Sequence, residues 1–492
     1  MPIQSEYLAL LAVLGFILTY CLIPVTKKLA FAHGFVSYPG VRKIHTGPIP
    51  ALGGLAIFAP QVLLFVLFGY LVTSGSIWVT RTETAKFVSL FIGSVWILSL
   101  GIIDDRVNLG WRKKLLGQIL GIGIVLLGGH TIGSVDIPFY GPLDFGPLGY
   151  PLLGFIVLLI TNAVNLIDGM DGLAGGVCFF AAITCGVFAI FRSDFLIASI
   201  AFTISGSLLA FLRYNFPPAS IFMGDSGSLS LGFILSVLAT SNIVKAPGQR
   251  YATLTTMLAL LLPFAIALID VFLAIARRWI SGRKIFLPDS DHIHHRFMEM
   301  FKRPRLVVGI FYVFSALFCL LTLLITITPE SRLTSIIGAV TVLALIATMA
   351  IVLKLYRIDR LTSVLKNRHD FQFLSTFNSY MELRVERAKC VDELIFLLES
   401  GVRDLDFDAV EVNSNGSKRC VWNKNQKVHL DTPRLNECRV FKDCDVTIMW
   451  TVPTHDDRTY QKYLELVWHR FLNQLECKNA LLIREKTINH VE

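Results

Sequence analysis

Residues 149–191 read GYPLLGFIVLLITNAVNLIDGMDGLAGGVCFFAAITCGVFAIF, which is two apolar runs joined by a short turn. Each run, 149–167 and 173–191, has the length that an α-helix needs to cross a bilayer. The turn between them carries Asp168 and Asp171. Carboxylates are costly beside lipid, so a pair of them at the end of a membrane helix indicates a functional site.

Apolar runs of this kind recur along the chain. The 492 residues are 54% hydrophobic and 16% charged, and a mean hydropathy of +0.61 is too high for a soluble protein. We therefore predict an all-α polytopic membrane protein with about eleven transmembrane helices. The predicted spans are 5–26, 52–73, 86–103, 115–130, 149–167, 173–191, 194–212, 227–244, 252–276, 306–328 and 333–354.

Basic residues are unevenly distributed between the predicted loops. The net charge of +9 lies entirely before Arg357, because basic and acidic residues are equal in number from there onward. Lys and Arg concentrate in the loops after spans 1, 3 and 9, which the positive-inside rule assigns to the cytoplasm. Lys27 and Lys28 follow the first span and no basic residue precedes it, which predicts an outside N-terminus and an uncleaved first span.

Two adjacent carboxylates end the third span, in the sequence Gly101-Ile-Ile-Asp-Asp-Arg106. Like charges as close as Asp104 and Asp105 resist joint ionisation, which raises one pKa and makes the pair a candidate general base. Lys114 follows at the start of the fourth span, where its ammonium group could meet a phosphate. The alternative is a solvated loop whose basic residues only set the topology.

The end of the fifth span carries a polar ladder. Asn162, Asn165, Asp168 and Asp171 are spaced three residues apart, so on a helix they lie side by side. Their amides and carboxylates supply oxygen ligands for a hydrated metal ion and hydrogen bonds for a nucleotide. Helix packing through polar side chains is the alternative interpretation.

A glycine-rich turn, Gly224-Asp-Ser-Gly227, precedes the eighth span. It places Asp225 beside backbone N–H groups that could cradle phosphate oxygens, and the carboxylate could bind a cation. Turns of this composition are common, and no Gly-Lys-Ser/Thr follows, so this is not a Walker loop.

The last motif is Asp289-Ser-Asp-His-Ile-His-His-Arg296, in the long basic loop after the ninth span. A zinc site is one interpretation, but no thiolate is near, and the other motifs offer the hard oxygens that magnesium prefers. Asp270 lies within the ninth span and must have a partner there. The side chains of the motif that could bind a pyrophosphate or a sugar are His292, His294, His295 and Arg296.

The composition changes at Arg357, after which no segment could span a bilayer. The stretch 391–405 has the apolar stripe of an amphipathic helix, and 446–452 alternates like a half-buried strand. We predict that 357–492 form a small cytoplasmic α+β domain, which resembles GAF-like ligand-sensing domains in element order. A membrane-anchored sensor that functions through this domain is therefore an alternative for the whole chain.

Taken together and in this order, the four motifs resemble those of the polyprenyl-phosphate N-acetylhexosamine-1-phosphate transferases, a branch of glycosyltransferase family 4. The resemblance covers residues 8–356. The His-x-His-His pattern of 292–295 is similar to the bacterial undecaprenyl-phosphate GlcNAc-1-phosphate transferases, whereas the phospho-MurNAc-pentapeptide translocases are more distant. The resemblance implies a membrane-embedded transferase domain over 1–356, and the domain that follows lies outside it.

The resemblance also implies roles for individual residues. Asp104, Asp105 and Asp168 match catalytic positions, and Asp171 and Asp225 match magnesium-ligand positions. The chain departs from the family at Ser37, where Asp is usual, so any role of that carboxylate in metal or phosphate handling is open here. The positions matched to substrate binding are Arg42, Lys43, His45, Lys114, Asn162, Asn165, Asn215, Phe222, His292, His294, His295 and Arg296.

The implied reaction transfers GlcNAc-1-phosphate from UDP-GlcNAc to undecaprenyl phosphate at the bacterial cytoplasmic (inner) membrane. It releases UMP, initiates a cell-surface glycan and uses Mg²⁺, with Mn²⁺ as the substitute. UDP-MurNAc-pentapeptide or another UDP-N-acetylhexosamine is the alternative donor. A transporter is less favoured, because its carboxylates would lie near the midplane on inverted repeats. A homodimer is a possible assembly, and no nucleic-acid partner is expected.

Overall fold

The structure is a computed structural model of the chain. The chain divides into two compact units, Met1–Ala274 with Pro288–Leu353, and Ile275–Leu287 with Lys354–Glu492. The residues that the structure describes are 2–37, 47–75, 79–137, 141–241, 252–253, 261–280, 293–327, 368–388, 391–405, 409–414, 417–423, 436–439, 446–451 and parts of 464–478.

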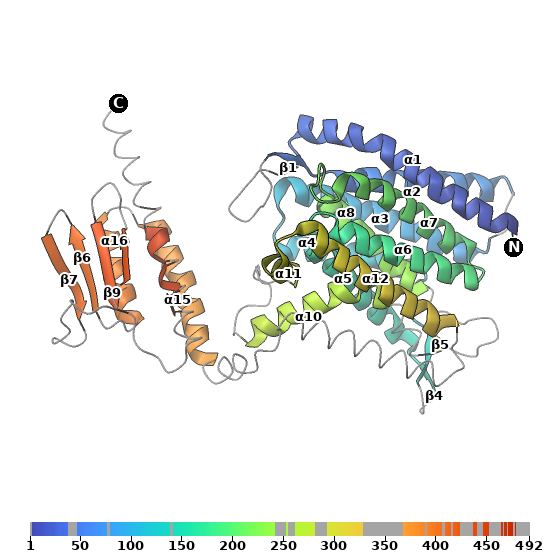
Figure 1. The fold of residues 1–492 in the computed structure, drawn as a ribbon. Coiled ribbons are helices and arrows are strands. Elements are labelled where there is room, and N and C mark those ends of the chain that lie inside the picture. The colour runs from blue at the N-terminus through green and yellow to red at the C-terminus, as the bar shows by residue number, and fades with distance from the viewer. Residues whose placement is uncertain are drawn as a thin grey trace. The chain divides into compact units, whose positions relative to one another are not determined.

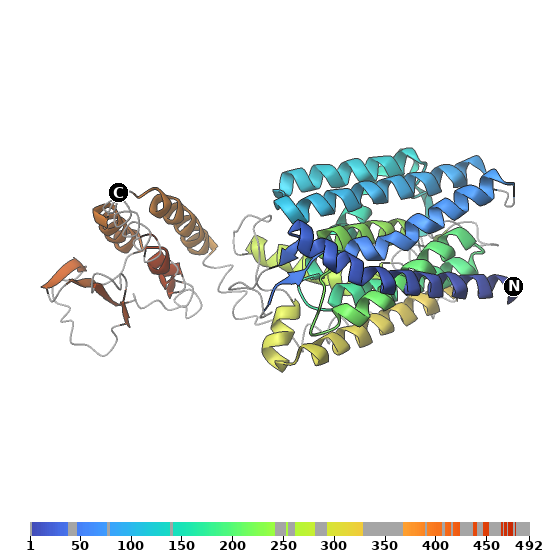
Figure 2. The ribbon, with the colours of Figure 1, turned by 90° about the horizontal axis from the view of Figure 1, so that it is seen from above.

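Long helices dominate the first unit and run beside one another as a bundle (Figure 1, and from above in Figure 2). Seven of the described helices are long and apolar enough to cross a membrane. The predicted all-α polytopic membrane protein is confirmed, while the count of eleven spans stays a prediction. The helices are α1 (Pro2–His33), α2 (Gly53–Thr73), α3 (Arg81–Val107), α4 (Trp111–Leu127), α5 (Gly149–Ile167), α6 (Leu173–Phe191), α7 (Phe195–Asn215), α8 (Gly224–Ser241), α10 (Ala265–Ile280), α11 (Ile293–Phe301) and α12 (Pro304–Ile327).

Short strands occupy segments that the sequence assigned to loop or helix. The predicted ninth span begins at residue 252, but Ala252–Thr253 form strand β5, which pairs in parallel with β3 (Ser134–Ile137). β3 also pairs with β4 (Gly141–Asp144), and β1 (Val36–Ser37) pairs with β2 (Ile49–Pro50), both antiparallel. The helix of the ninth span, α10, starts only at Ala265. Hydrophobic periodicity is a local signal, so it does not detect pairing between distant segments.

Helix α8 lies at the centre of the bundle, with every residue from Ser226 to Thr240 buried. Two glycines of neighbouring helices let it pack backbone to backbone. A Cβ atom on Gly54 of α2 would collide with the backbone of Gly227, and one on Gly101 of α3 would collide with the backbone of Ser226. The first turn of α8 is therefore held against α2 and α3, in the manner of small-residue contacts between membrane helices.

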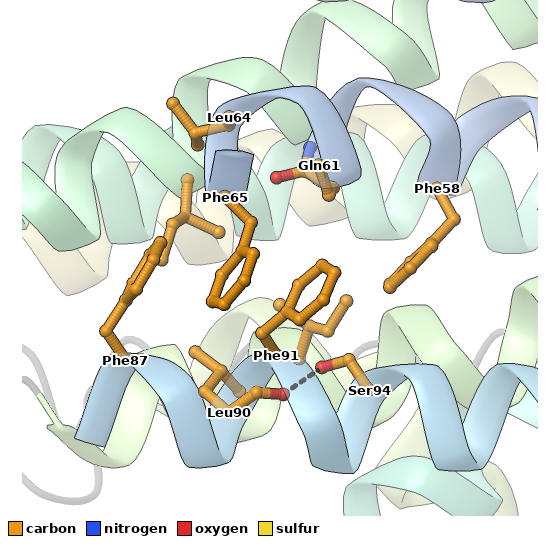
Figure 3. Close-up of a pocket in the computed structure, with 10 residues that line it drawn as sticks. Phe58, Gln61, Leu64, Phe65, Phe87, Leu90, Phe91 and Ser94 are labelled. Carbon is orange, nitrogen blue, oxygen red and sulfur yellow. Dashed lines mark hydrogen bonds between the residues drawn. The ribbon is translucent and has the colours of Figure 1, made fainter. Parts of the chain in front are cut away.

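A small aromatic pocket lies between α2 and α3 (Figure 3). Rings from both helices line it, and those of Phe65 and Phe91 stack with centroids 3.8 Å apart. The amide of Gln61 is buried at its wall, and neither its Oε1 nor its Nε2 has a hydrogen-bond partner among the described residues. A buried amide without a partner lowers stability, because its hydration is lost without replacement.

The second unit contains helices packed with an antiparallel sheet of strand order β7-β6-β9-β8. Its buried apolar side chains come from both helices and from helical residues near the C-terminus, Trp468 and Phe471 among them. The role and the cytoplasmic location predicted for 357–492 stay predictions. The elements are α15 (Arg368–Arg387), α16 (Val391–Asp404), β6 (Ala409–Ser414), β7 (Ser417–Asn423), β8 (Asn436–Arg439) and β9 (Val446–Thr451).

Candidate active site

The ammonium group of Lys114 joins three of the predicted motifs. Its Nζ atom lies 2.8 Å from Asp104 Oδ2 on α3 and 2.6 Å from Asp225 Oδ2 on α8, and it donates to Asn165 Oδ1 on α5 at 3.2 Å. Asp104 is almost fully buried, with 4% of its side chain exposed, while 34% of the Asp225 side chain is exposed. Four helices thus converge on one cation, and one of the two carboxylates bound to it remains accessible.

Asp105 has a different environment from its neighbour. Its Oδ1 accepts a hydrogen bond from the backbone N–H of Asp225 at 2.7 Å, and its Oδ2 accepts one from Ser226 at 3.1 Å. These N–H groups belong to the first turn of α8, where helical donors have no partner within the helix and the dipole favours a negative charge. Asp105 therefore fixes the start of the helix that carries Asp225.

The amide of Asn165 holds Asp225 from the other side. Its Nδ2 donates to Asp225 Oδ1 at 2.7 Å and contacts Ser228 Oγ at 2.8 Å. Asn162, one turn deeper, exchanges hydrogen bonds with Gln118 of α4 at 2.9 and 3.2 Å. Sequence reasoning missed Gln118, although its position four residues after Lys114 places it on the same face of an apolar helix.

Asp168 and Asp171 lie on the turn that joins α5 to α6. Asp171 Oδ2 accepts a hydrogen bond from the backbone N–H of Ala219 at 2.8 Å. Asp168 is half-buried and has no hydrogen bond or ion pair to the described residues. Burial raises the pKa of Asp168 well above its ordinary value, and the negative charges of Asp225, Asp105 and Asp171 raise it further. This turn thus contains negative charge that nearby described cations do not balance.

Two residues matched to nucleotide binding, Asn215 and Phe222, lie at the end of α7 and in the loop that leads to α8. Asn215 is buried, its Oδ1 accepting from the backbone N–H of Gly172 at 2.9 Å and its Nδ2 donating to Ile221 O at 2.8 Å. The backbone of Phe222 pairs with Pro50 and Gly53 in the segment that leads into α2. Asn215 therefore joins the loop between α7 and α8 to the turn between α5 and α6, and direct contact of Asn215 or Phe222 with a nucleotide stays a prediction.

The histidine motif is described in part. His294 is buried on α11, and its Nδ1 lies 3.8 Å from Asp270 Oδ2. Asp270 thus has the partner that its place within an apolar helix requires. Arg296 is half-buried on the same short helix. Arg42, Lys43, His45 and His292, together with the side chain of His295, lie outside the described residues.

The carboxylates of this region fit a cation that keeps part of its water shell. Among the described residues, no three His, Cys, Asp or Glu side chains form a cluster that could hold a metal ion. Magnesium, however, is commonly held by one or two carboxylates plus the phosphates of a substrate. Burial is the first cause of the raised pKa of Asp168, and the negative charges of Asp225, Asp105 and Asp171 raise it further; repulsion of this kind is what a bound cation relieves.

The fold and the site define a polytopic membrane protein with a lysine–carboxylate centre where its helices end. Residues 87–242 match the family model of glycosyl transferase family 4. The chain is 35% identical over 297 residues to a probable undecaprenyl-phosphate N-acetylglucosaminyl 1-phosphate transferase of Bacillus subtilis, covering 60% of this chain and 78% of the relative. The chain therefore belongs to the polyprenyl-phosphate N-acetylhexosamine-1-phosphate transferase family.

Two further relatives show how wide this similarity is. A decaprenyl-phosphate N-acetylglucosaminephosphotransferase of Mycobacterium tuberculosis is 33% identical over 325 residues, which is 62% of this chain and 79% of the relative. A phospho-N-acetylmuramoyl-pentapeptide-transferase of Clostridium perfringens is 29% identical over 311 residues, which is 61% of this chain and 90% of the relative. The similarity thus covers most of each relative but less than two thirds of this chain.

Proposed function

We propose that this protein transfers GlcNAc-1-phosphate from UDP-GlcNAc to undecaprenyl phosphate and releases UMP, the first step of a cell-surface glycan. The observation that carries the proposal is the contact of Lys114 with both Asp104 and Asp225, one of which is accessible. A cation held in this way suits a substrate with two phosphates. The names of the Bacillus and Mycobacterium relatives, which specify N-acetylglucosaminyl phosphate transfer to a polyprenyl phosphate, support the choice of sugar.

In the proposed reaction, a phosphate oxygen of the lipid attacks the β-phosphorus of the UDP-sugar. The bond from that phosphorus to the oxygen bridging the two phosphates breaks, and UMP leaves with the bond's electron pair. During this step negative charge shifts from the lipid phosphate to the departing UMP, and the Lys114 ammonium group stabilises that charge. Preorganised positive charge of this kind is the main source of catalysis in phosphoryl transfer. Asp104 is the proposed base for a protonated lipid phosphate, because its Oδ2 contacts the same Lys114 ammonium as the accessible Asp225, while its Oδ1 accepts a hydrogen bond from the backbone N–H of Leu109.

We further propose that the enzyme requires Mg²⁺, with Mn²⁺ as a substitute. Asp225 and Asp171 would hold the ion; the accessibility of the Asp225 carboxylate and the repulsion of Asp168 by Asp225, Asp105 and Asp171 support this. The ion would supply Lewis-acid stabilisation of the pyrophosphate. The test is UMP release in excess EDTA. We expect activity to be lost and to return with Mg²⁺; full activity in EDTA, or restoration by Zn²⁺ alone, would contradict the proposal.

The proposed setting is the cytoplasmic membrane of a bacterium, with about eleven spans and the active site and residues 357–492 on the cytoplasmic side. The basic loops support this orientation under the positive-inside rule. In the described bundle, Arg106 at the end of α3 donates to His33 O at the end of α1 at 2.8 Å, so two basic loop regions and the site occupy the same end. Cysteine labelling of Lys28→Cys from outside intact cells should fail, whereas labelling after permeabilisation should succeed.

The donor sugar is tested by measuring UMP release from membranes supplied with undecaprenyl phosphate and a panel of UDP-sugars. We expect UDP-GlcNAc to be used with the highest kcat/KM. The Clostridium relative is named for transfer of a phospho-N-acetylmuramoyl-pentapeptide, so UDP-MurNAc-pentapeptide belongs in the panel. Preference for that donor would overturn the proposed sugar but not the reaction class, and absence of UMP release from every donor would overturn both.

A further inference from the structure

Asp270 is a buried carboxylate that the proposed reaction leaves without a role. It lies on α10 and is only 1% exposed. An ionisable side chain in such an environment is costly, so its presence calls for a specific partner and a specific function. Its two oxygens face the beginning of α11, a segment that follows it in the chain by more than twenty residues.

The contacts of Asp270 reach the backbone and the side chain of consecutive residues. Its Oδ1 accepts a hydrogen bond from the backbone N–H of Ile293 at 3.0 Å, in the first turn of α11. Its Oδ2 lies 3.8 Å from Nδ1 of His294, which is itself 3% exposed. One carboxylate thus fixes where α11 starts and also interacts with the imidazole that the helix carries.

The opposite edge of the same imidazole faces the acidic turn. A Cβ atom built on Gly169 would lie 2.9 Å from Nε2 of His294, closer than real Cβ contacts allow. Gly169 stands between Asp168 and Asp171, so the absence of a side chain there makes room for the ring. His294 is therefore held between Asp270 on one side and the turn of the proposed active site on the other.

We propose that Asp270 is a positioning residue for His294, whose buried Nε2 edge it holds against the turn of residues 168–171, so that the ring supports the backbone that presents Asp168 and Asp171 to the substrate. A carboxylate beside Nδ1 favours the proton on that nitrogen and limits rotation of the ring. His294 then supports the turn in one orientation and in one tautomer, and Gly169 supplies the space for the ring. This inference rests on the proposed transferase function, since it specifies a residue that orients the site of that reaction.

A double-mutant cycle tests the inference in the full-length protein in membranes. The variants are Asp270→Asn, His294→Gln and the pair. Asp270→Asn keeps an oxygen that can accept from Ile293 N but removes the negative charge facing His294. We expect each single change to lower kcat about 10- to 100-fold with little effect on the KM for lipid, as for other partners that orient a functional histidine. The double variant should be no more than about threefold worse than either single one.

A matched control separates positioning from a general loss of stability. His130 is also a buried histidine; its ring contacts Ser241 Oγ and Lys86 O, and within the described part of the chain it makes no hydrogen bond to the acidic residues of the site. His130→Gln should lower the melting temperature while kcat per folded protein stays near the wild-type value. Gly169→Ala should lower kcat, and this loss should not multiply with that of His294→Gln.

Effects of Asp270→Asn and His294→Gln that multiply in the double variant would overturn the inference. So would a kcat loss in Asp270→Asn that disappears when activity is expressed per folded protein, as in His130→Gln. The cycle is measured with whichever UDP-sugar the wild-type protein uses. A wild-type protein that releases no UMP from any donor would instead contradict the proposed function itself.

Discussion

At the scale of single residues, the site depends on how two adjacent carboxylates divide their contacts. Asp104 contacts Lys114, whereas Asp105 accepts two backbone hydrogen bonds from α8. Successive residues on a helix point about 100° apart, so one faces α4 and the other faces α8. In the paired-aspartate motif, Asp104 thus contacts the lysine of the candidate site, and Asp105 holds the helix that carries Asp225.

Lys114→Met should lower kcat by about 100- to 1,000-fold, because one preorganised cation is lost from the developing charge. Lys113→Met is the matched control, because Lys113 is the adjacent residue and its side chain is exposed. UMP release per folded protein measures both variants. If Lys113→Met lowered kcat as much as Lys114→Met, the effect would come from the reduced positive charge of the surface and not from the contacts of Lys114.

Asp168→Asn should raise the melting temperature of the metal-free protein at neutral pH while abolishing turnover. The pKa of Asp168 is raised, so the folded state binds this proton more tightly than the unfolded chain. The contribution to stability is present at low pH and is lost as the pH rises through the raised pKa. We expect a gain of about 2 °C at neutral pH that shrinks as the pH falls toward 3.8, the ordinary value.

A lower melting temperature for Asp168→Asn at neutral pH would contradict this electrostatic account. The control is Glu83→Gln, because Glu83 lies in the first turn of α3, at the opposite end of that helix from Asp104, and accepts from the backbone N–H of Thr80 at 2.9 Å. Removing that negative charge from a helix N-terminus should lower stability instead. The measurement is the melting temperature of both metal-free variants and of the wild type across the pH range.

At the scale of elements, α8 is positioned by its first turn. The backbone of that turn packs on Gly54 and Gly101 and donates to Asp105, while Asn165 binds its Asp225 side chain. Small residues allow the close approach, and the carboxylate caps the helix. The position of Asp225 is therefore a property of the contact between α2, α3, α5 and α8, more than of the turn sequence that contains it.

Asp105→Ala should lower the free energy of unfolding by about 1–2 kcal/mol, as expected for a lost helix cap. It should also lower kcat, because the start of α8 and hence Asp225 are no longer fixed. Asp105→Ser, which can accept from one of the two N–H groups, should recover part of both. Unfolding and UMP release are measured together, and a variant as stable as the wild type yet inactive would indicate direct participation of Asp105 in catalysis.

The two buried glutamines of the bundle offer a paired test of polar packing. Gln61→Met should stabilise the protein by about 1 kcal/mol with unchanged kcat, because an amide without a described partner is removed from the pocket of Figure 3. Gln118→Met should destabilise it by about 1–3 kcal/mol, because the amide of Asn162 loses its partner. Destabilisation by both changes would indicate that Gln61 binds water or lipid in that pocket.

At the scale of the whole molecule, two compact units are joined in one chain, and the match to the family model lies within the first of them. The match to the family model ends at residue 242, and the relatives cover no more than 62% of the chain. The described contacts of the candidate site come from the first unit alone. We expect the second unit to be accessory to the chemistry.

Truncation after Arg360 should leave UMP release per inserted protein within about threefold of the full-length value, since no described site contact would be removed. Activity and protein level are measured together in membranes, with the Lys114→Met full-length protein as the inactive reference. A truncated protein that inserts normally but is inactive would show that the second unit completes the active site. A change in regulation with preserved turnover would support a sensory role.

The sequence by itself determined the membrane class, the position of most helices and the residues that gather at the site. Span lengths, polar ladders and charged loops are local patterns. Each indicates burial or topology, but none indicates which helix lies beside it. The start of α10 was misplaced, because a strand pairing between residues far apart in the chain intervenes.

Only the tertiary structure decided which polar groups face one another. It assigned Lys114 to Asp104 and Asp225, Asp105 to the N-terminus of α8, and Asp270 to His294. It also left Gln61 without a described partner while pairing Gln118 with Asn162. The physical reason is that such contacts depend on the rotation and register of one helix against another, which side-chain packing across the whole bundle fixes.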